Sequence, residues 1–485
     1  MIANRGEIAV RVIRTCRKMG IRTVAVYSEA DRTSMHVRMA DQAFLLGPGP
    51  SSESYLLADK LIDICKREEV DAIHPGYGFL SENPAFARKL QESGIILIGP
   101  SADAMEVMGS KLASKKAVAD FDVPLVPGTE HAVEDPEEAK KIAREIGMPV
   151  LIKASAGGGG KGMRIVEKEE DLNRQMKMAI SEAISSFGDG SVFIEKYIGG
   201  PKHIEIQVLG DEHGNYIYAF ERECSVQRRH QKLVEEAPSA VVDEELRNKI
   251  GNAAINVARS CNYTGAGTVE FLLDENRNFY FLEMNTRLQV EHPISEMITG
   301  LDLVEWQIRV ARGEKLSFTQ DDLQINGHAI ELRLCAEDPT NDFLPDIGTL
   351  ERYRPPSADH IRIDGFVEEG STIPIFYDNM FAKLCVWGKD RTEAIERMKD
   401  AIRRFEIEGI ATTLDFGYFV MEHPSFIDGS FDTHFVQNHF SPEKLQENGM
   451  NDDRAAALLS AWFLKNHNPI VTPLAERGSD WYEKR

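Results

Sequence analysis

The stretch FYFLEMNTRLQVEHP covers residues 279–293, and its pattern changes partway along. The first four residues are apolar, as in a β-strand, and a polar residue then recurs at every second position. Because side chains alternate along a strand, these polar residues would share one face if the strand stays extended: Glu283, Asn285, Arg287, Gln289 and Glu291. A half-exposed edge strand would explain the pattern without any function. Oxygen ligands for a divalent cation beside a fork for an oxyanion instead predict a phosphoryl-transfer site.

The composition is that of a soluble globular protein with room for about three domains. No apolar run approaches the roughly 18 residues that a membrane-spanning helix needs. The net charge of −22 argues against non-specific binding to nucleic acid or to an anionic membrane. The six cysteines are scattered without a CxxC motif, so we expect reduced thiols in a cytoplasmic protein. The Arg-rich residues 1–20 include Glu7 and lack an apolar run, so we expect them to fold rather than to act as a targeting peptide.

Strand and helix patterns alternate over residues 1–110. We expect strands at 2–4, 23–27, 71–74 and 95–98, with a helix after residue 7 and further helices at 55–68 and 84–93. This order predicts a parallel, doubly wound sheet. No GxGxxG motif follows the first strand, so dinucleotide binding is not supported. That strand is short, which raises the question whether its opening residues lie upstream of Met1.

A second unit of alternating elements covers residues 126–197, and a strand-rich stretch follows it. The expected elements of the second unit are helices at 135–146 and 169–185 and strands at 149–154, 163–166 and 191–197. The strand-rich stretch is expected to contain strands at 203–209, 215–221, 267–273 and 279–285, and then a helix at 301–312. Residues 327–445 have the pattern of another α+β unit, and a helix is expected at 454–465 in the polar tail.

The glycine cluster AGGGGKG at residues 156–162 has two interpretations. It is either a flexible loop tip or a loop whose backbone amides fold over phosphate groups. A Walker loop is excluded, because Gly162 follows Lys161 where a serine or threonine is required, and because the loop joins two strands. In the phosphate-binding interpretation, Lys153 at the end of the preceding strand places an ammonium group beside those phosphates.

Three further polar features each keep a structural alternative. The basic run QRRHQK at residues 227–232 is either a solvated loop or, with the acidic residues that follow it, an anion site. The motif HPGYG at residues 74–78 lies at the carboxyl end of a predicted strand, where open α/β sheets bind ligands, but a structural turn explains it at least as well. His203 is either a hydrogen-bonded strand histidine or a site residue.

Taken together, these motifs resemble the biotin carboxylase family of the ATP-grasp superfamily. The resemblance covers about residues 1–445 in collinear order. The matching segments are IANRGEIAVR at 2–11, HPGYGFLSEN at 74–83, IKASAGGGGKGMR at 152–164, EKYI at 195–198, HIEIQVLGD at 203–211, ERECSVQRRHQKLVEEAP at 221–238, GAGTVEF at 265–271, EMNTRLQVEHPISEMITGLDL at 283–303 and GHAIELRLCAEDP at 327–339.

The resemblance implies a mixed α/β and α+β fold in three domains. It implies an N-terminal Rossmann-like domain with a doubly wound parallel sheet over residues 1–110. An ATP-grasp domain over 111–326 is expected to carry a mobile glycine-rich lid at 126–197. A C-terminal α+β biotin carboxylase domain over 327–445 and a tail over 446–485 complete the expected organisation.

The activity implied is the ATP- and bicarbonate-dependent carboxylation of biotin through carboxyphosphate, catalysed by an ADP-forming ligase. The expected cofactors are ATP and Mg²⁺ (or Mn²⁺), and biotin is a carrier-bound substrate that is not attached to this chain. The expected partners are a biotin carboxyl carrier protein and the carboxyltransferase subunit of an acyl-CoA carboxylase of the acetyl or propionyl type. A homodimer is expected, without nucleic acid or membrane. The alternatives are the biotin carboxylase subunit of a pyruvate carboxylase, another ATP-grasp carboxylate–amine ligase, and an ATP-binding regulatory subunit with an inactive site.

The family's functional positions carry over to matching residues of this sequence. ATP phosphates would be held by Lys111, Lys153 and the amides of Gly159 and Gly160. Adenine would lie along the backbone of Glu195, Lys196, Tyr197 and Ile198, and the nucleotide would also contact His203 and His230. Magnesium and ATP would be bound by Glu270 and Glu283, with Asn285 as a further metal ligand. The bicarbonate and biotin pocket would comprise Tyr77, Lys232, Arg287, Gln289 and Val290, with Glu291 as the base and Arg333 facing the ureido oxygen of biotin.

The tripeptide Met176-Lys177-Met178 matches the core of a biotinylation sequence. In carrier domains that lysine lies on a β-hairpin of a small all-β module. Here the tripeptide falls in the helix predicted at 169–185. We therefore expect Lys177 to be an ordinary surface lysine that carries no biotin.

Overall fold

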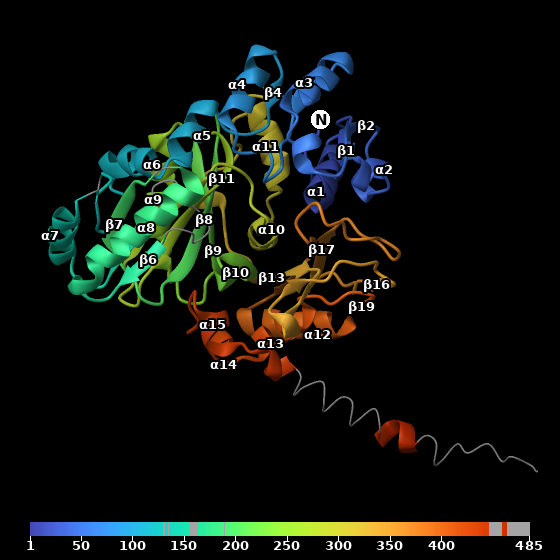
Figure 1. The fold of residues 1–485 in the computed structure, drawn as a ribbon. Helices are drawn as coiled ribbons and strands as arrows, with labels where there is room; N and C mark the ends of the chain where they lie inside the picture. The colour runs from blue at the N-terminus through green and yellow to red at the C-terminus, as the bar shows by residue number, and fades with distance from the viewer. Residues whose placement is uncertain (130, 134, 155–162, 189, 446–457, 463–485) are drawn as a thin grey trace, which may run out of the picture.

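The computed structural model describes residues 1–129, 131–133, 135–154, 163–188, 190–445 and 458–462. It combines parallel N-terminal strands, a large antiparallel sheet and a smaller three-stranded sheet, which is the mixed architecture that the sequence predicts (Figure 1). The glycine cluster lies outside the described residues, as does most of the helix predicted at 454–465, of which residues 458–462 are helical.

The N-terminal unit is a parallel sheet flanked by helices. Its elements are α1 (Gly6–Lys18), β1 (Val24–Ser28), α2 (Met35–Met39), β2 (Gln42–Gly47), α3 (Ala58–Arg67), β3 (Ala72–Ile73), α4 (Pro84–Glu92), β4 (Ile96–Leu97) and α5 (Ala102–Gly109). The pair β1–β2 and the pair β3–β4 are both parallel. Ile2 joins the two pairs, because it forms parallel bridges with Ala25 and His74. The short first strand therefore lies at the centre of the doubly wound sheet.

Helix α1 shows how the local sequence builds this unit. Ile8, Val12 and Ile13 recur at helical spacing and are buried. Two basic residues in the last turn face the negative end of the helix dipole. Glu7 in the first turn is also buried, although a carboxylate at a helix start usually faces water. Its partners lie at the candidate site.

His74 is the turn residue of the HPGYG motif and is held neutral. Its Nδ1 accepts a hydrogen bond from the backbone N–H of Gly76 (3.0 Å), so its Nε2 carries the proton toward Gln307 Oε1 (3.1 Å). Burial lowers the pKa of His74 to about 4, and burial likewise lowers the pKa of His36 to about 4. The structural-turn interpretation of the motif therefore describes the role of His74.

These two histidines predict acid sensitivity below neutral pH. The unfolded chain binds protons near pH 6.5 but the folded chain only near pH 4, so stability is complete above 6.5 and falls as the pH drops toward 4. Each group contributes up to about 3 kcal/mol to this loss. We expect urea unfolding followed between pH 7 and pH 5 to show it, and His74→Asn, which keeps an acceptor for Gly76, to reduce the slope. An unchanged slope in that variant would contradict the assignment.

The large sheet is antiparallel and forms the frame of the site. Its order is β12-β11-β8-β9-β10-β13-β18-β17. The strands are β8 (Lys202–Gly210), β9 (Tyr216–Arg228), β10 (Gln231–Ala237), β11 (Gly265–Leu273), β12 (Phe279–Asn285), β13 (His328–Cys335), β17 (Ile361–Gly365) and β18 (Met380–Gly388). β9 extends seven residues beyond the strand predicted at 215–221. The pairing of Val234 with Leu332 joins β10 to β13, so one sheet runs from the strand-rich stretch into the C-terminal strands.

The two faces of β8 have different chemistry. Ile204, Ile206 and Val208 pack in one apolar cluster with residues of α9 (Glu244–Ser260). The alternating residues His203, Glu205 and Gln207 lie on the opposite face and are also buried. A buried polar face needs partners, and here they come from the neighbouring strands β9, β10 and β11. The helices of this part of the chain also include α6 (Lys111–Val118), α10 (His292–Thr299) and α11 (Leu303–Ala311).

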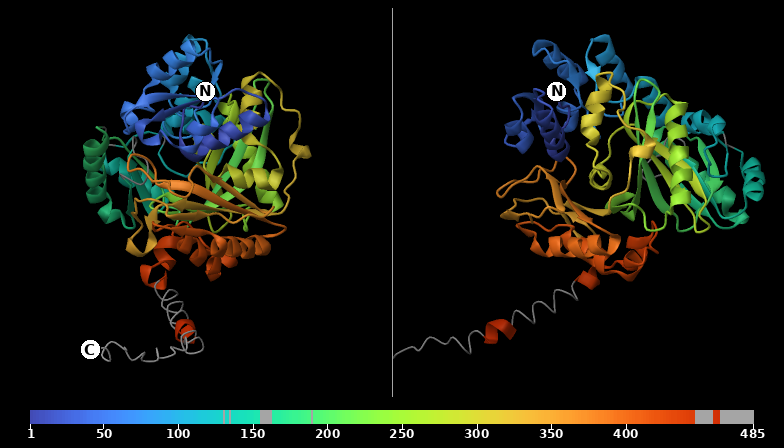
Figure 2. Two further views of the ribbon diagram at one scale, coloured as in Figure 1. Left: turned by 90° about the vertical axis from the view of Figure 1, so that its right-hand side faces the viewer. Right: turned by 180° about the vertical axis from the view of Figure 1, so that it is seen from behind.

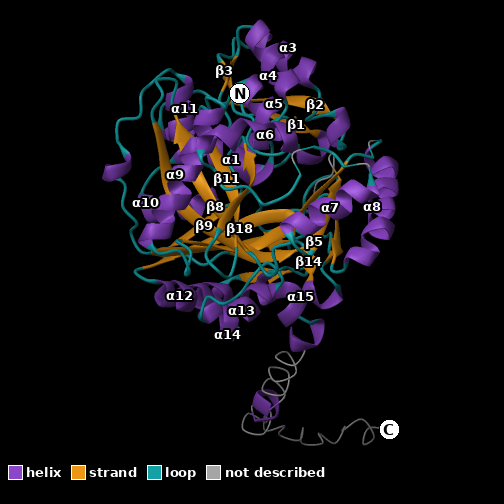
Figure 3. Cartoon of the chain, turned by 90° about the vertical axis from the view of Figure 1, so that its left-hand side faces the viewer, coloured by secondary structure: helices purple, strands orange, loops and turns teal. Residues whose placement is uncertain are grey.

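A small α/β unit covers one end of this sheet. Its sheet has the order β6-β5-β7 and lies against two neighbouring helices, α7 and α8 (Figure 3). The elements are α7 (Pro136–Ile146), β5 (Val150–Ala154), β6 (Met163–Val166), α8 (Leu172–Phe187) and β7 (Val192–Lys196). Met176 is buried in α8 and Lys177 is exposed on it, so the biotinylation-like tripeptide lies on a helix and not on a hairpin.

The C-terminal strands are covered by helices on the side away from the N-terminal unit (Figure 2). Leu384 and Met398 belong to the apolar cluster between the sheet and α12. The elements are β14 (Glu337–Asp338), β15 (Leu344–Pro345), β16 (Arg352–Arg354), α12 (Arg391–Arg404), β19 (Glu406–Glu408), α13 (Leu414–Glu422), α14 (Pro424–Ile427) and α15 (Phe435–His439). Among the described residues, no helix has the length and apolar character needed to cross a membrane.

Candidate active site

The polar segment at 279–293 is a strand, a turn and a helix in succession. β12 ends at Asn285, which confirms the strand predicted at 279–285, and α10 begins at His292. The condition for one shared strand face as far as Glu291, a strand that stays extended, is therefore not met. Pro293 lies in the first turn of α10, where its fixed φ favours a helix start. The carbonyl oxygen of Gln289 accepts from the backbone N and from Nδ1 of His292, at 3.3 and 2.8 Å. The polar side chains nevertheless converge, because the turn folds back over β8 and β10.

The ammonium group of Lys232 lies among three carboxylates of the site. From β10 it donates to Glu205, to Glu270 Oε1 (3.1 Å) and to Glu291 Oε1 (2.7 Å). Burial disfavours its charge, but these three carboxylates outweigh burial and raise its pKa well above the ordinary value. The sequence assigned Lys232 to the anion pocket, and the structure places it against the assigned base.

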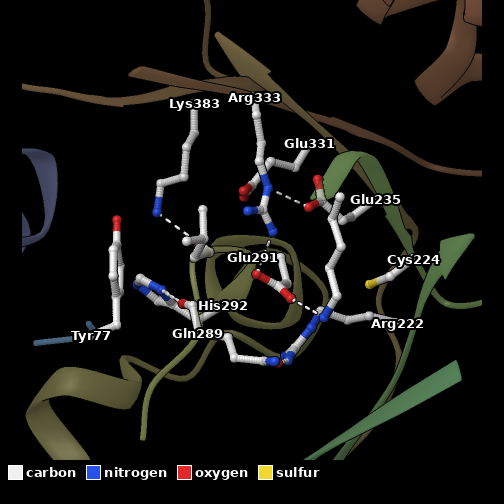
Figure 4. Close-up of polar contacts among 12 residues, drawn as sticks. Tyr77, Arg222, Cys224, Glu235, Gln289, Glu291, His292, Glu331, Arg333 and Lys383 are labelled. Carbon is white, nitrogen blue, oxygen red and sulfur yellow. Dashed lines mark hydrogen bonds and ion pairs between the residues drawn. The ribbon is translucent and has the colours of Figure 1, made fainter. Parts of the chain in front are cut away.

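Arg333 lies on the other side of Glu291. Its Nη2 donates to Glu291 Oε2 at 2.8 Å and its Nε to Glu235 Oε1 at 2.6 Å, as Figure 4 shows. Burial alone would raise the pKa of Glu291, but Lys232, Arg333 and Arg222 together hold it well below its usual range. Glu291 is therefore a charged carboxylate between two cations. Burial raises the pKa of Glu235 to about 7 in spite of its arginine partner.

Arg222 holds Glu205 and Gln289 of this cluster in place and was not predicted from the sequence. It is fully buried on β9, and its guanidinium donates to Glu205 and to Gln289 Oε1 (2.9 Å). Its remaining acceptors are Gln207 Oε1, Thr268 Oγ1 and Ser295 Oγ. A buried guanidinium with this many partners is a rigid support. In the sequence Arg222 stands between Glu221 and Glu223, just beyond the strand predicted at 215–221, and nothing there marks it as a buried support.

A divalent cation fits the carboxylates beside this cluster. Glu270 Oε1 accepts from Asn285 Nδ2 (2.9 Å) and Gln289 Nε2 (2.8 Å), and Glu270 Oε2 lies 3.0 Å from Nε2 of His203. Glu283 faces the same place with solvent access. Loss of hydration and the neighbouring charge of Glu270 raise the pKa of Glu283. The negative charges of Glu270 and Glu283 repel each other, and this repulsion contributes to the raised pKa of Glu283. A divalent cation such as Mg²⁺ would relieve it.

Arg287 and Tyr77 link the site to the N-terminal unit. The Nε of Arg287 donates to Glu82 Oε2 (2.8 Å), and its Nη2 donates to Asn285 Oδ1 (2.9 Å). The hydroxyl of Tyr77 donates to Glu7 Oε1. Glu82 and Glu7 were not predicted as site residues, because their partners lie about 200 and 70 positions away in sequence, respectively.

The predicted phosphate-binding lysines lie on the side of the small α/β unit. Lys153 Nζ lies 2.5 Å from Glu195 Oε2, and Lys115 donates to the other oxygen of the same carboxylate. Loss of hydration and the charge of Lys153 lower the pKa of Lys111, and the negative charge of Glu283 partly offsets this effect. Lys153 and Lys115 share the single negative charge of Glu195, so this cluster has a net positive charge that can attract an anionic ligand. Lys115 was not predicted from the sequence.

The remaining residues predicted to bind nucleotide are only partly described. Gly159 and Gly160 lie outside the described residues. Glu195 is buried at the end of β7, and Lys196 Nζ donates to two backbone carbonyl oxygens of the loop before β5, both at 3.0 Å. Tyr197 and Ile198 follow in the connection to β8.

The basic run at 227–232 divides into exposed and buried residues. Arg229 and His230 form the tip of the β9–β10 hairpin with positive φ, both are exposed, and Arg229 pairs with Asp342 at 2.7 Å. Gln227 is buried against Nδ1 of His203 (3.0 Å), and Lys232 points into the site. The solvated-loop interpretation therefore fits the tip of the hairpin and the anion-site interpretation fits its base. The assignment of His230 to the nucleotide stays a prediction.

Three family models match the chain in collinear order. They are "Biotin carboxylase, N-terminal domain" at residues 1–105, "Carbamoyl-phosphate synthase L chain, ATP binding domain" at 110–319 and "Biotin carboxylase C-terminal domain" at 331–438.

Curated relatives match about nine-tenths of the chain. Biotin carboxylase 1 of Bacillus subtilis is 50% identical over 90% of this chain and 98% of its own length. A pyruvate carboxylase subunit of Methanothermobacter thermautotrophicus is 52% identical over 90% and 89%. The mitochondrial propionyl-CoA carboxylase alpha chain of Homo sapiens is 52% identical, but the match spans 60% of that longer protein.

Solved structures share both the fold and about half of the sequence. Biotin carboxylase of Campylobacter jejuni, in a complex with an ATP compound, has a TM-score of 0.86 and 47% identity and covers 90% of this chain and 98% of its own. The biotin carboxylase domain dimer of Hydrogenobacter thermophilus 2-oxoglutarate carboxylase, with MgADP, ADP and bicarbonate, has a TM-score of 0.85 and 49% identity, covering 90% and 96%.

Proposed function

The chain belongs to the biotin carboxylase family, and we propose that it carboxylates biotin on a separate carrier protein, as the first half-reaction of an acyl-CoA carboxylase. Biotin carboxylation is an ADP-forming ligase reaction that uses ATP, Mg²⁺ and bicarbonate. The separate carrier, the carboxyltransferase partner and the acyl-CoA acceptor are the proposed part.

The position of Glu291 between Lys232 and Arg333 is the observation that carries the proposal. Either cation can turn from Glu291 to an incoming anion while Glu291 keeps the other cation, so that no unpaired charge remains in the site. Bicarbonate would bind between Lys232 and Arg287, with its proton directed toward Glu291. We assign Glu291 as the group that receives this proton when bicarbonate oxygen attacks the terminal phosphorus of ATP and ADP leaves.

The residues on the nucleotide side bind and orient the phosphates. Lys111 and Lys153 neutralise phosphate charge, and Glu195 holds Lys153 in place. Mg²⁺ at Glu270, Glu283 and Asn285 would supply further charge neutralisation at the phosphates. The backbone along Glu195–Ile198 and the amides of Gly159 and Gly160 are proposed nucleotide contacts, as are His203 and His230.

Arg333 is proposed to stabilise biotin after the first step. Carboxyphosphate breaks down to carbon dioxide and inorganic phosphate. The ureido nitrogen of biotin transfers its proton to that phosphate and attacks the carbon dioxide. The ureido oxygen then carries negative charge, which a permanently charged guanidinium stabilises. Arg333 is held in place by Glu235, and we place Tyr77 beside the same substrate.

The proposal also names the class of molecule that finally receives the carboxyl group, an acyl-CoA. Relatives named propionyl-CoA and methylcrotonoyl-CoA carboxylase chains support an acyl-CoA acceptor. The relative named as part of a pyruvate carboxylase supports the alternative, pyruvate. We further propose a homodimer, because a solved relative is described as a dimer, and a cytoplasmic location, because all six cysteines are free thiols.

The test measures ADP release by the purified chain. We expect release that depends on bicarbonate and is stimulated by free biotin. Release that needs an amine in place of bicarbonate would indicate another ATP-grasp ligase, and tight ATP binding without turnover would indicate a regulatory role. Co-purification from native extract should bring down a biotinylated carrier and a carboxyltransferase; activity of that complex on pyruvate but not on acyl-CoA would overturn the proposed acceptor.

A further inference from the structure

Lys383 reaches the turn of the candidate site from a strand that the proposed reaction does not use. It lies on β18 and its side chain is 0% exposed. Its Nζ donates to the backbone carbonyl oxygen of Val290 at 2.7 Å, and Figure 4 shows it pointing at this turn beside Arg333. The same Nζ lies 3.3 Å from Glu7 Oε1, on α1 of the N-terminal unit.

A fully buried ammonium needs a counter-charge to remain charged. Burial disfavours the charge of Lys383, but Glu7, Glu331 and Asp364 outweigh burial and raise its pKa. These carboxylates come from α1, β13 and β17, and Glu7 is the one that lies at ion-pair distance from the ammonium. Burial raises the pKa of Glu7 and of Glu331, whereas at Asp364 burial is outweighed by nearby cations, led by Arg362, which lower its pKa. The contact with Val290 is therefore a charge-assisted hydrogen bond, which is stronger than one between neutral groups.

The turn that receives this hydrogen bond has little other support. Residues 286–291 belong to no strand or helix, so no sheet ladder fixes their backbone. Among the described residues, the side chains that hydrogen-bond to the backbone of the turn are Glu82 at the N–H of Thr286, Arg287 at the carbonyl of Leu288, His292 at the carbonyl of Gln289, and Lys383 at the carbonyl of Val290. Lys383 acts on the peptide that joins Val290 to Glu291, immediately before the proposed base, whereas His292 acts on the preceding peptide.

We propose that Lys383 is a positioning residue of the carboxylation site. Its ammonium holds the Val290 carbonyl so that Gln289 faces Arg222 and Glu291 faces Lys232 and Arg333, and Glu7 holds the ammonium in place. Because Glu7 also accepts from Tyr77, the same contact ties the turn to the HPGYG segment. The inference rests on the proposed role of this turn in bicarbonate binding.

The test separates positioning from folding by comparing two Michaelis constants. We expect Lys383→Met to raise the KM for bicarbonate about tenfold, because the turn loses its anchor, while the KM for ATP changes less than about twofold. Lys383→Arg retains a cation that can reach the carbonyl and should recover most of the loss. Glu7→Gln, which leaves the ammonium less firmly held, should give an intermediate KM for bicarbonate.

Lys202→Met is the matched control. Lys202 is also a largely buried lysine that donates to backbone carbonyl oxygens, but these belong to Gly429 (2.9 Å) and Phe431 in the segment after α14 and not to the turn. We expect it to lower the Tm without changing the KM for bicarbonate. An unchanged KM in Lys383→Met, or an equal rise in both Michaelis constants, would overturn the positioning role.

Two further measurements keep the test decisive. If Lys383→Met does not fold, Glu7→Gln is compared with wild type, and an unchanged KM for bicarbonate in that variant would again overturn the inference. Bicarbonate-dependent ADP release by the wild-type chain tests the proposed function separately. Its absence would remove the proposed function, whereas normal release with unaffected variants would remove only the role of Lys383.

Discussion

Replacing Arg333 with alanine is expected to lower biotin carboxylation by about 10²- to 10³-fold, with the affinity for ADP unchanged. Arg333 touches both Glu291 and Glu235 with its guanidinium, at 2.8 and 2.6 Å. Its charge would lie beside the ureido oxygen when that oxygen becomes negative. The nucleotide residues Lys111 and Lys153 lie on other elements and keep their partners in this variant.

The stability of the Arg333→Ala variant has to be measured together with its activity. Removing one partner of a buried ion pair costs about 3 kcal/mol, and Glu235 loses the guanidinium that donates to it. Arg391→Ala is the matched control, because Arg391 also pairs with a buried carboxylate, Glu236 Oε2 at 2.7 Å, but away from the site. We expect both variants to unfold at lower urea concentration and only Arg333→Ala to lose turnover. Turnover within twofold of wild type in Arg333→Ala would remove this residue from the mechanism.

The alternation of side chains along single strands was readable from the sequence. His203, Glu205 and Gln207 face the site and the residues between them face α9, as a period of two predicts. The same rule failed after Asn285, because the chain turns into α10. Pro293 followed by an apolar periodic run is a helix-start signal, and it outweighs a strand pattern.

The partners of these side chains were not readable, because they depend on non-local pairing. Arg333 meets Glu235 because β13 pairs with β10 in one register, and the two residues are 98 positions apart. Arg222 and Lys383 are buried charges on strands, and sequence alone gives no counter-charge for either. Glu82 and Glu7 reach the site only after the N-terminal unit packs on the large sheet. The types of residue at the site were thus predictable, and the supports that orient them were not.

Replacing Glu291 with glutamine is expected to lower bicarbonate-dependent ATP cleavage by about 10²- to 10⁴-fold, as the loss of a general base does. The amide keeps the shape of the side chain but cannot take a proton. Lys232 keeps Glu205 and Glu270 as partners and Arg333 keeps Glu235, so the site retains compensated charges and the fold is expected to survive. The loss should therefore fall on kcat, with the KM for ATP little changed.

The pH dependence of this step follows from the charges around Glu291. Lys232 and Arg333 hold its pKa well below the usual range, so it stays ionised at every pH above about 4.5, and its titration cannot limit the rate near neutrality. Burial raises the pKa of Glu235 to about 7, so this carboxyl changes charge near neutrality, and burial also raises the pKa of its neighbour Glu331. Glu221→Gln is the matched control, since Glu221 is a fully buried carboxylate on β9 paired with Arg247 at 2.7 Å, toward α9 and away from the site. Wild-type ATP cleavage in Glu291→Gln, or an equal loss in Glu221→Gln, would contradict the assignment of Glu291 as the base.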